Sequence, residues 1–220
     1  MGFKKNLFCA GAFALGALAA PLPDCPDRAP ATGGPAALTA ATLIAIAPNT
    51  ESCAGADFPE ECADASTAAT ALTKAFNTYN ITSKGEQAAI IAYELFESGD
   101  FKYNKNHYPG RPGQGTRMMA MPNYVEKYAT SVAGADAVSK AKAAGGDAGL
   151  VAVLALVNSD DEKSFGSAAW FVSTVCSAEI RAGLAAATKD GWDKFLSDCV
   201  ETPADPARDP AWTAAIANIK

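Results

Sequence analysis

The sequence has one histidine, His107, and it lacks the patterns that mark several common catalytic or cofactor sites. A zinc site is disfavoured because a single histidine and no paired C-x-x-C motifs cannot supply the usual four ligands. No G-x-S-x-G segment is present, which excludes a serine nucleophile on a strand-to-helix elbow. The glycine-rich run 110–115 lacks the Lys-Ser/Thr pair that completes a phosphate-binding loop. We therefore expect neither a metal nor a cofactor.

Basic residues and long apolar runs are also scarce. Eighteen Lys and Arg oppose twenty-four Asp and Glu, for a formal net charge of −6. Nucleic-acid binding requires a basic surface, so we expect no nucleic-acid partner. The apolar run 7–20 follows Lys4 and Lys5 and ends in small residues, which is typical of a secretory signal peptide and too short for a membrane anchor. Residues 1–20 are therefore predicted to be removed from a secreted, extracellular protein that does not associate with membranes.

The rest of the chain predicts a short leader followed by one helical domain. Residues 21–36 are rich in Pro, Ala, Gly and Asp, as expected of a disordered leader or linker. Residues 37–220 are long enough for one hydrophobic core, and we expect a monomer. Alanine is abundant, apolar residues recur at spacings of three and four, and alternating runs of β-branched residues are scarce. The fold class is therefore predicted to be all-α, with a small β-hairpin or ordered loop near residues 98–116.

Nine helices are expected in this domain from the apolar spacing and from the positions of Gly and Pro. Their predicted ranges are 37–46, 65–79, 84–96, 122–130, 135–143, 148–158, 164–187, 191–199 and 210–219. The segment 164–187 is predicted to be the buried central helix, with Gly183 bending or ending it.

Six cysteines predict disulfides if the protein is secreted, and one of the six lies in the signal segment. Five remaining cysteines allow fifteen arrangements with one left free, and the sequence alone does not select among them. Short loop closures favour Cys53–Cys62 and Cys176–Cys199. This pairing would leave Cys25 free or in a removed leader.

One segment combines a helix end with a polar loop, and it contains the strongest candidate for catalysis. Glu97 is placed on the last turn of a half-buried helix, where desolvation raises the pKa of a carboxyl group. A carboxyl group that stays protonated near neutral pH can act as a general acid. The alternative is an ordinary helix end whose Glu97 faces solvent. Aromatic and amide side chains suited to binding sugars follow: Tyr103, Tyr108, Gln114, Asn123 and Tyr124.

Three patches resemble family 19 chitinases and their lysozyme-like superfamily. "AYELFESGDFKY" at 92–103 is similar to the helix end that carries the family's catalytic acid, and "YPGRPGQGT" followed by "PNYVEKY" is similar to its groove-lining stretch. Leu156-Val157 with "SFGSAAWF" at 164–171 resembles the family's core helix. The resemblance implies that Glu97 is the acid. It also places Gln114, Asn123 and Tyr124 in the groove.

This chain departs from the family pattern at the second carboxylate. Phe96 replaces the histidine before the acid, and the family's second glutamate has no counterpart. An inverting glycosidase needs a base about 6.5–9.5 Å from the acid. Asp100 is the nearest candidate, while Asp160 or Asp161 folding over the groove, or a mechanism with one acid, are the alternatives. His107 is interpreted as an exposed loop residue or a sugar contact rather than a base.

The function implied by the resemblance is that of a secreted glycoside hydrolase cleaving β-1,4 bonds in N-acetylhexosamine polymers. Peptidoglycan is the first expected substrate, which would make the protein a muramidase, or lysozyme. Chitin or chitosan is the second. Glu97 would donate the proton, with Asp100 as the second catalytic residue. The remaining alternative is a secreted protein that binds a glycan, or another partner, without catalysis.

Overall fold

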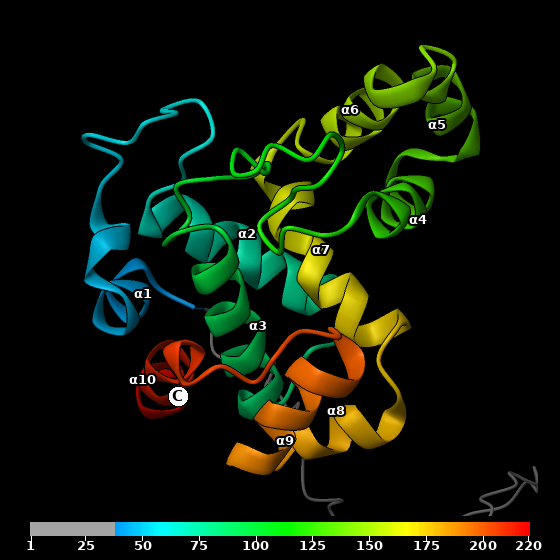
Figure 1. Ribbon diagram of the computed structural model, residues 1–220. Helices are drawn as coiled ribbons and strands as arrows, with labels where there is room; N and C mark the ends of the chain where they lie inside the picture. Colours follow the sequence, from blue (N-terminus) through cyan, green and yellow to red (C-terminus); the bar gives the residue numbers. More distant parts are fainter. Residues whose placement is uncertain (1–37) are drawn as a thin grey trace, which may run out of the picture. The chain divides into compact units, whose positions relative to one another are not determined.

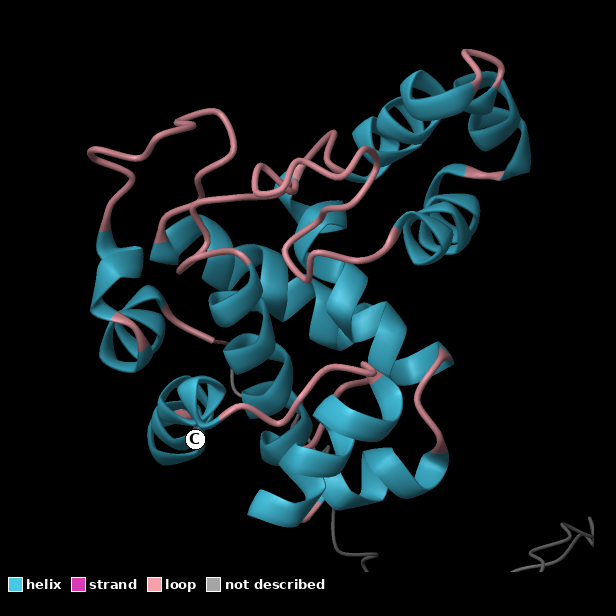
Figure 2. Cartoon of the chain, in the orientation of Figure 1, coloured by secondary structure: helices cyan, strands magenta, loops and turns pink. Residues whose placement is uncertain are grey.

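The computed structural model describes residues 38–220, which belong to one compact unit. The expected signal peptide at 1–20 and the expected leader at 21–36 lie outside the described residues. Between 38 and 220 the chain is mainly helical, with loops and only isolated β-bridges, at Lys105–Gly115 and Gly115–Ala120 (Figure 2). The predicted all-α class is confirmed. The expected hairpin is reduced to these bridges within an ordered loop.

Ten α-helices and three shorter helices make up the described part of the chain. The α-helices are α1 (Ala40–Ile46), α2 (Ala65–Thr78), α3 (Lys84–Glu97), α4 (Pro122–Ala133), α5 (Ala135–Lys142), α6 (Gly146–Val157), α7 (Asp161–Thr174), α8 (Ala178–Ala185), α9 (Lys189–Lys194) and α10 (Asp209–Asn218). The shorter helices are η1 (Pro48–Glu51), η2 (Phe195–Cys199) and η3 (Pro206–Arg208). Several helices begin where a side chain caps the free backbone amides; Asp64, for example, accepts a hydrogen bond from the Thr67 amide before α2.

The core is centred on α3 and α7. Helix α2 packs along α7, α10 and α8 pack against α3, and α4, α5 and α6 pack on one another (Figure 1). Every residue of α3 from Gly85 to Leu95 is buried, and so is every residue of α7 from Ser164 to Val172. Because these stretches of α3 and α7 are enclosed on all sides, the packing of the core fixes where the last turn of α3 lies.

The predicted central helix at 164–187 is two helices, α7 and α8. The chain leaves α7 at Thr174, and the hydroxyl of Ser177 accepts a hydrogen bond from the Ile180 amide to begin α8. Cys176, in the break, is bonded to Cys199. Gly183 lies inside α8 and does not end it.

Both predicted disulfides are present, Cys53–Cys62 and Cys176–Cys199. Cys25 lies outside the described residues.

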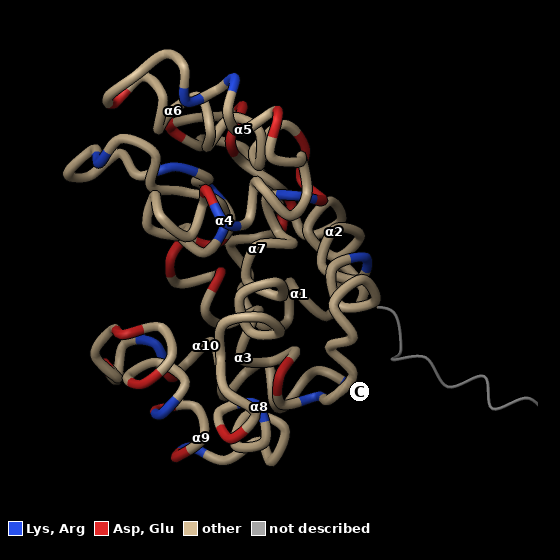
Figure 3. Tube along the Cα trace, turned by 90° about the vertical axis from the view of Figure 1, so that its right-hand side faces the viewer, with Lys and Arg blue, Asp and Glu red and all other residues tan. Residues whose placement is uncertain are grey.

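Acidic and basic residues are interspersed along the chain trace (Figure 3). Among the helices of residues 38–220, none has the length and apolar character needed to cross a membrane.

Candidate functional site

A pocket of about 240 Å³ lies between the end of α3 and the loop that leads to α4. We call it the loop pocket. Apart from Glu97, its lining residues come from the loop segment 103–119, and the full set is Glu97, Tyr103, Lys105, Asn106, His107, Tyr108, Gln114 and Met119. The pocket therefore combines a carboxyl group, an imidazole, two phenols and two amides.

Glu97 is the last residue of α3, and it is paired with a residue far along the chain. Its Oε1 lies 2.6 Å from Nη1 of Arg208, and its side chain is 19% exposed. The Arg208 guanidinium also stacks on the ring of Phe96, 4.1 Å from its centroid. Burial raises the pKa of the Glu97 carboxyl above its ordinary value, although the charge and hydrogen bond of Arg208 act in the opposite direction. Glu97 therefore keeps its proton to a higher pH than an exposed glutamate does.

The surroundings of Glu97 differ from the expectation at Phe96. The spacing of Ala89, Ile90, Tyr93 and Phe96 predicts one apolar, buried face of the helix, but Phe96 is 42% exposed. Glu97 follows Phe96 at the C-terminal end of the helix, where the enclosed part of α3 has already ended. The Arg208 guanidinium pairs with the carboxyl and lies 5.7 Å from the ring centroid of buried Tyr93.

His107 is held by a buried carboxylate. Its Nε2 lies 2.9 Å from Oε1 of Glu61, and the two side chains are 16% and 3% exposed. The same Glu61 oxygen binds Nζ of Lys105 at 2.8 Å, and the second oxygen accepts a hydrogen bond from the Asn104 amide at 3.1 Å. Burial raises the pKa of Glu61, but the hydrogen bonds from Lys105, Asn104 and His107 outweigh it and lower the pKa below its ordinary value. Glu61 is therefore ionised and acts as the acceptor.

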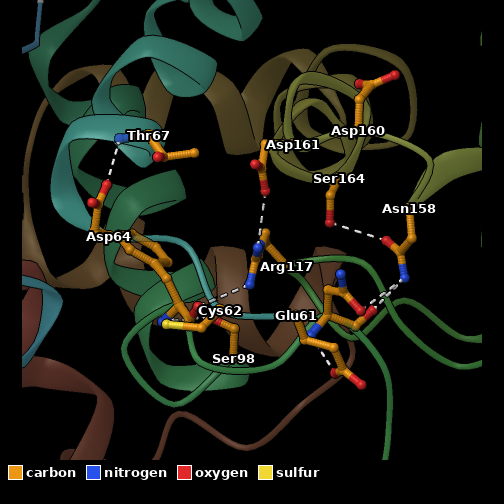
Figure 4. A network of polar contacts seen from close by, with 12 residues as sticks. Glu61, Cys62, Asp64, Thr67, Ser98, Arg117, Asn158, Asp160, Asp161 and Ser164 are labelled. Carbon is orange, nitrogen blue, oxygen red and sulfur yellow. Dashed lines mark hydrogen bonds and ion pairs between the residues drawn. The ribbon is translucent and has the colours of Figure 1, made fainter. Parts of the chain in front are cut away.

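A polar network fixes the backbone that carries His107 (Figure 4). Arg117 is buried, and its Nη1 donates hydrogen bonds to the carbonyls of Phe101 and Tyr103. Figure 4 shows the guanidinium pointing toward Asp161, which it meets at 3.1 Å. The side-chain amide of Asn158 donates to the Asn104 carbonyl at 2.7 Å. Because these partners come from other parts of the chain, the segment is positioned by the fold.

The structure brings four of the seven predicted site residues together. Glu97, Tyr103, Tyr108 and Gln114 all line the loop pocket. It places the other three elsewhere. Asp100, Asn123 and Tyr124 are not among the residues lining the loop pocket.

Each of these three has other surroundings. The carboxylate of Asp100 accepts a hydrogen bond from Asn49 Nδ2 at 3.0 Å. Asn123 is exposed in the first turn of α4, while the ring of Tyr124 packs edge-on against Phe171, with centroids 5.0 Å apart. The predicted second carboxylate is thus directed to another partner.

The two alternative carboxylates also have structural partners. The side chain of Asp160 accepts a hydrogen bond from the Lys163 amide at the start of α7, and Asp161 pairs with Arg117. Neither lines the loop pocket. Asp160 therefore caps the N-terminus of α7, and Asp161 belongs to the polar network around Arg117.

The sequence did not point to Glu61 or Arg208, and it led us to interpret His107 as a loop residue or sugar contact rather than as a base. One feature of the sequence could have pointed to Glu61. It precedes Cys62, and the predicted Cys53–Cys62 disulfide restrains the backbone at that position. The sequence holds no comparable signal for Arg208, which lies 111 residues from Glu97. Within residues 38–220, no group of three or more His, Cys, Asp or Glu is arranged to hold a metal ion.

Comparison with known proteins gives one relative. The chain is 37% identical over 149 residues to a bifunctional dioxygenase (DOX)-epoxy alcohol synthase (EAS) of Fusarium oxysporum (strain Fo5176). The match covers 63% of this chain and 11% of that protein, so the chain corresponds to about a tenth of its relative's length. No family model and no solved structure matches the chain.

This comparison corrects the functional prediction. The prediction of a glycoside hydrolase acting on peptidoglycan or chitin is wrong, because the relative is named as a dioxygenase and epoxy alcohol synthase. The resemblance to family 19 chitinases has no match among families or structures to support it. The expected polysaccharide partner, the expected absence of nucleic-acid and membrane partners, the monomeric state and the extracellular location stay predictions.

Proposed function

We propose that the loop pocket is a site of acid–base catalysis, with Glu97 as proton donor and His107 as proton acceptor. One observation carries the proposal: Glu97, whose pKa is raised, and His107, which is held by the ionised Glu61, line the same pocket. A proton donor and a proton acceptor that line one pocket are the arrangement that general acid–base catalysis requires.

The hydrogen bond from His107 to Glu61 determines which ring nitrogen acts. Because Glu61 is ionised, Nε2 of His107 carries the proton and donates it to Glu61 Oε1. In the neutral ring the other nitrogen, Nδ1, is then a free acceptor. When Nδ1 takes up a proton, the carboxylate of Glu61 stabilises the positive ring, as the buried carboxylate of a catalytic triad does.

We propose an epoxide as the substrate. The Fusarium relative is named for the synthesis of an epoxy alcohol, and this chain matches 11% of that protein. Opening an epoxide with water requires an acid at the ring oxygen and a base at the water, and the loop pocket holds one of each. Tyr103, Tyr108, Asn106 and Gln114 supply hydrogen-bonding groups for the hydroxyl of an epoxy alcohol.

The proposed step needs no oxidant or reductant. Glu97 gives its proton to the epoxide oxygen as one C–O bond breaks, and water attacks the carbon of that bond. Nδ1 of His107 takes the proton that the water loses. The epoxide and one water become a vicinal diol, and proton exchange with solvent restores Glu97 and His107.

Turnover of small epoxy alcohols by the full chain tests this proposal. Glycidol and 2,3-epoxyhexan-1-ol are incubated with the protein, and the products, glycerol and the corresponding triol, are quantified by NMR. We expect enzyme-dependent product, and Glu97→Gln should lower the rate by about a hundredfold because the amide cannot donate the proton. Glu126→Gln is the matched control, since Glu126 lies on α4 and binds Lys142. If wild type and Glu97→Gln give the same rate, Glu97 is not the acid.

A second candidate function is ligand binding without turnover. The observation that favours it is the 2.6 Å contact between Glu97 and Arg208, which occupies one oxygen of the proposed acid. In this case the epoxy alcohols would shift the NMR signals of His107, the only histidine, while no triol forms. Shifts without product favour binding, whereas product formation that depends on Glu97 favours catalysis.

We also propose that the protein works in an oxidising compartment, outside the cell. The two disulfides among the described residues support this location, because such bonds are rare in a reducing cytosol. Fractionation of the culture of a secreting host, followed by immunoblotting of cells and medium, would test it. Retention of the whole protein inside the cells would contradict it.

A further inference from the structure

A short loop closed by a disulfide packs against the segment that carries His107. Residues 53–62, here called the clasp loop, are joined at their ends by Cys53–Cys62. The clasp loop meets the segment that carries His107 through three side chains. Tyr103 donates a hydrogen bond to Asp57 at 3.0 Å, Phe58 stacks on His107, and Glu61 binds His107 and Lys105.

The contact between Phe58 and His107 is a close parallel stack. The ring centroids lie 3.6 Å apart and the planes differ by 10°. Most aromatic pairs have centroids about 4.5–7 Å apart and are offset or edge-on. A parallel ring at this distance covers one whole face of the imidazole, so it restricts rotation of His107 about its side-chain bonds. It leaves the ring edge, which carries both nitrogens, uncovered.

The position of Phe58 depends on the clasp loop rather than on a helix. Between Cys53 and Cys62 the chain forms turns and bends only, and Gly55 has a positive φ of 76°. The loop backbone has few hydrogen bonds of its own. The disulfide therefore limits how far Phe58 and Glu61 can move away from His107, because it ties the start of the loop to the residue that follows Glu61.

We propose that Phe58 is a positioning residue for His107, and that the Cys53–Cys62 disulfide holds Phe58 in place. This inference rests on the proposed function, in which His107 is the base. The stack sets the plane of the imidazole so that Nε2 meets Glu61 and Nδ1 stays free to accept a proton. Phe58 itself does not line the loop pocket and acts only through His107.

The tautomer of His107 reports on this role directly, because the chain has no other histidine. In protein labelled with 15N-histidine, a long-range 1H–15N spectrum recorded near pH 8 distinguishes a proton on Nε2 from one on Nδ1. We expect wild type to show one neutral tautomer, protonated at Nε2. Phe58→Leu should give averaged shifts from two tautomers, and Phe58→Tyr, which keeps a stacking ring, should restore the single tautomer.

The two disulfides provide a matched pair of controls. Cys53→Ser with Cys62→Ser should lose the single tautomer as Phe58→Leu does, whereas Cys176→Ser with Cys199→Ser should leave the spectrum of His107 unchanged. Turnover of glycidol should fall about tenfold in Phe58→Leu, with KM little changed, since the pocket lining is intact. Phe58→Tyr should recover that rate.

The outcomes separate this inference from the proposed function. An unchanged tautomer in both Phe58→Leu and the Cys53/Cys62 double variant overturns the positioning role, whatever the activity. If wild type turns over no epoxy alcohol but the spectra change as expected, the proposed function fails and the positioning of His107 stands. If Phe58→Leu changes the spectrum and Phe58→Tyr does not restore it, the aromatic stack is not the cause and the inference also fails.

Discussion

Replacing Glu94 by Gln should change how the stability of the protein depends on pH. Glu94 lies in α3, one helical turn before Glu97, and is fully buried. Neither of its carboxylate oxygens has a hydrogen-bond partner among the residues that the structure describes. Burial raises the pKa of Glu94 well above its ordinary value, and the charge of Arg117 and the nearby backbone amide of Ala168, whose geometry falls short of a hydrogen bond, oppose this only in part. Glu94 is therefore protonated in the folded protein at pH values where it is ionised in the unfolded chain.

The sign and size of the effect follow from proton binding. Above the ordinary pKa of 4.5 the unfolded chain releases the Glu94 proton while the folded protein keeps it. The free energy of unfolding then falls by about 1.4 kcal/mol for each pH unit, until the pH reaches the pKa of the folded state. Glu94→Gln has no proton to release, so this contribution to the slope disappears. Glu61 and Glu97 titrate in both proteins, and their contributions cancel in the comparison.

Urea denaturation at several pH values measures this difference. Buried Trp170 and Trp192 provide a fluorescence signal for unfolding. Above about pH 5, and until the pH reaches the pKa of Glu94 in the folded protein, the variant should gain up to about 1.4 kcal/mol per pH unit relative to wild type. Glu51→Gln, the same substitution at an exposed position in η1, is the control for the loss of one carboxyl group. Parallel curves for Glu94→Gln and wild type would refute the argument that Glu94 is buried as a neutral acid.

Two further predictions concern the fold. Replacing Cys176 and Cys199 by Ser should lower the free energy of unfolding by about 3 kcal/mol, because the disulfide closes a loop with a sequence separation of 23 residues; in urea denaturation, a loss below about 1 kcal/mol would contradict this. Gly85→Ala should destabilise the protein by about 1–3 kcal/mol, although alanine favours helices, because a Cβ at this position would lie 1.9 Å from the Leu184 carbonyl oxygen. An unchanged or raised Tm for Gly85→Ala would show that α3 and α8 can separate at no cost.

The sequence predicted the helices well because their signals are local. Apolar spacing and capping residues lie within a few positions of each helix end, and α2 and α3 agree with the predicted ranges to within one residue. The break between α7 and α8 was missed because the apolar pattern continues across it. Ser177 is a good N-cap, but a serine inside an apolar pattern is weak evidence for a new helix until Cys176 is seen to be tied to Cys199.

The burial of Glu97, the proposed acid, could be predicted from the sequence, but its partner could not. The position of Glu97 at the end of an apolar helix indicated burial, and its pKa is raised for that reason. Its partner Arg208 could not be predicted, since the pairing depends on how the segment before α10 packs against α3. The same holds for Glu61 and His107, which lie 46 residues apart in two loops. Loop residues have no periodicity that fixes which of them meet.

The proposed acid, Glu97, and the proposed base, His107, are therefore positioned by different parts of the structure. Glu97 stands at the end of α3, which is buried from Gly85 to Leu95, so its position follows from the core. His107 and Glu61 stand on loops, and their meeting depends on the Cys53–Cys62 disulfide, the Phe58 stack and the hydrogen bonds to the segment 101–107. Mild reduction that opens the Cys53–Cys62 disulfide but leaves the core folded should then displace His107 from Glu61. Glu97 should keep its raised pKa under the same conditions. A site built in this way loses activity before it loses its fold, and the order of the two losses distinguishes it from a site built wholly on helices.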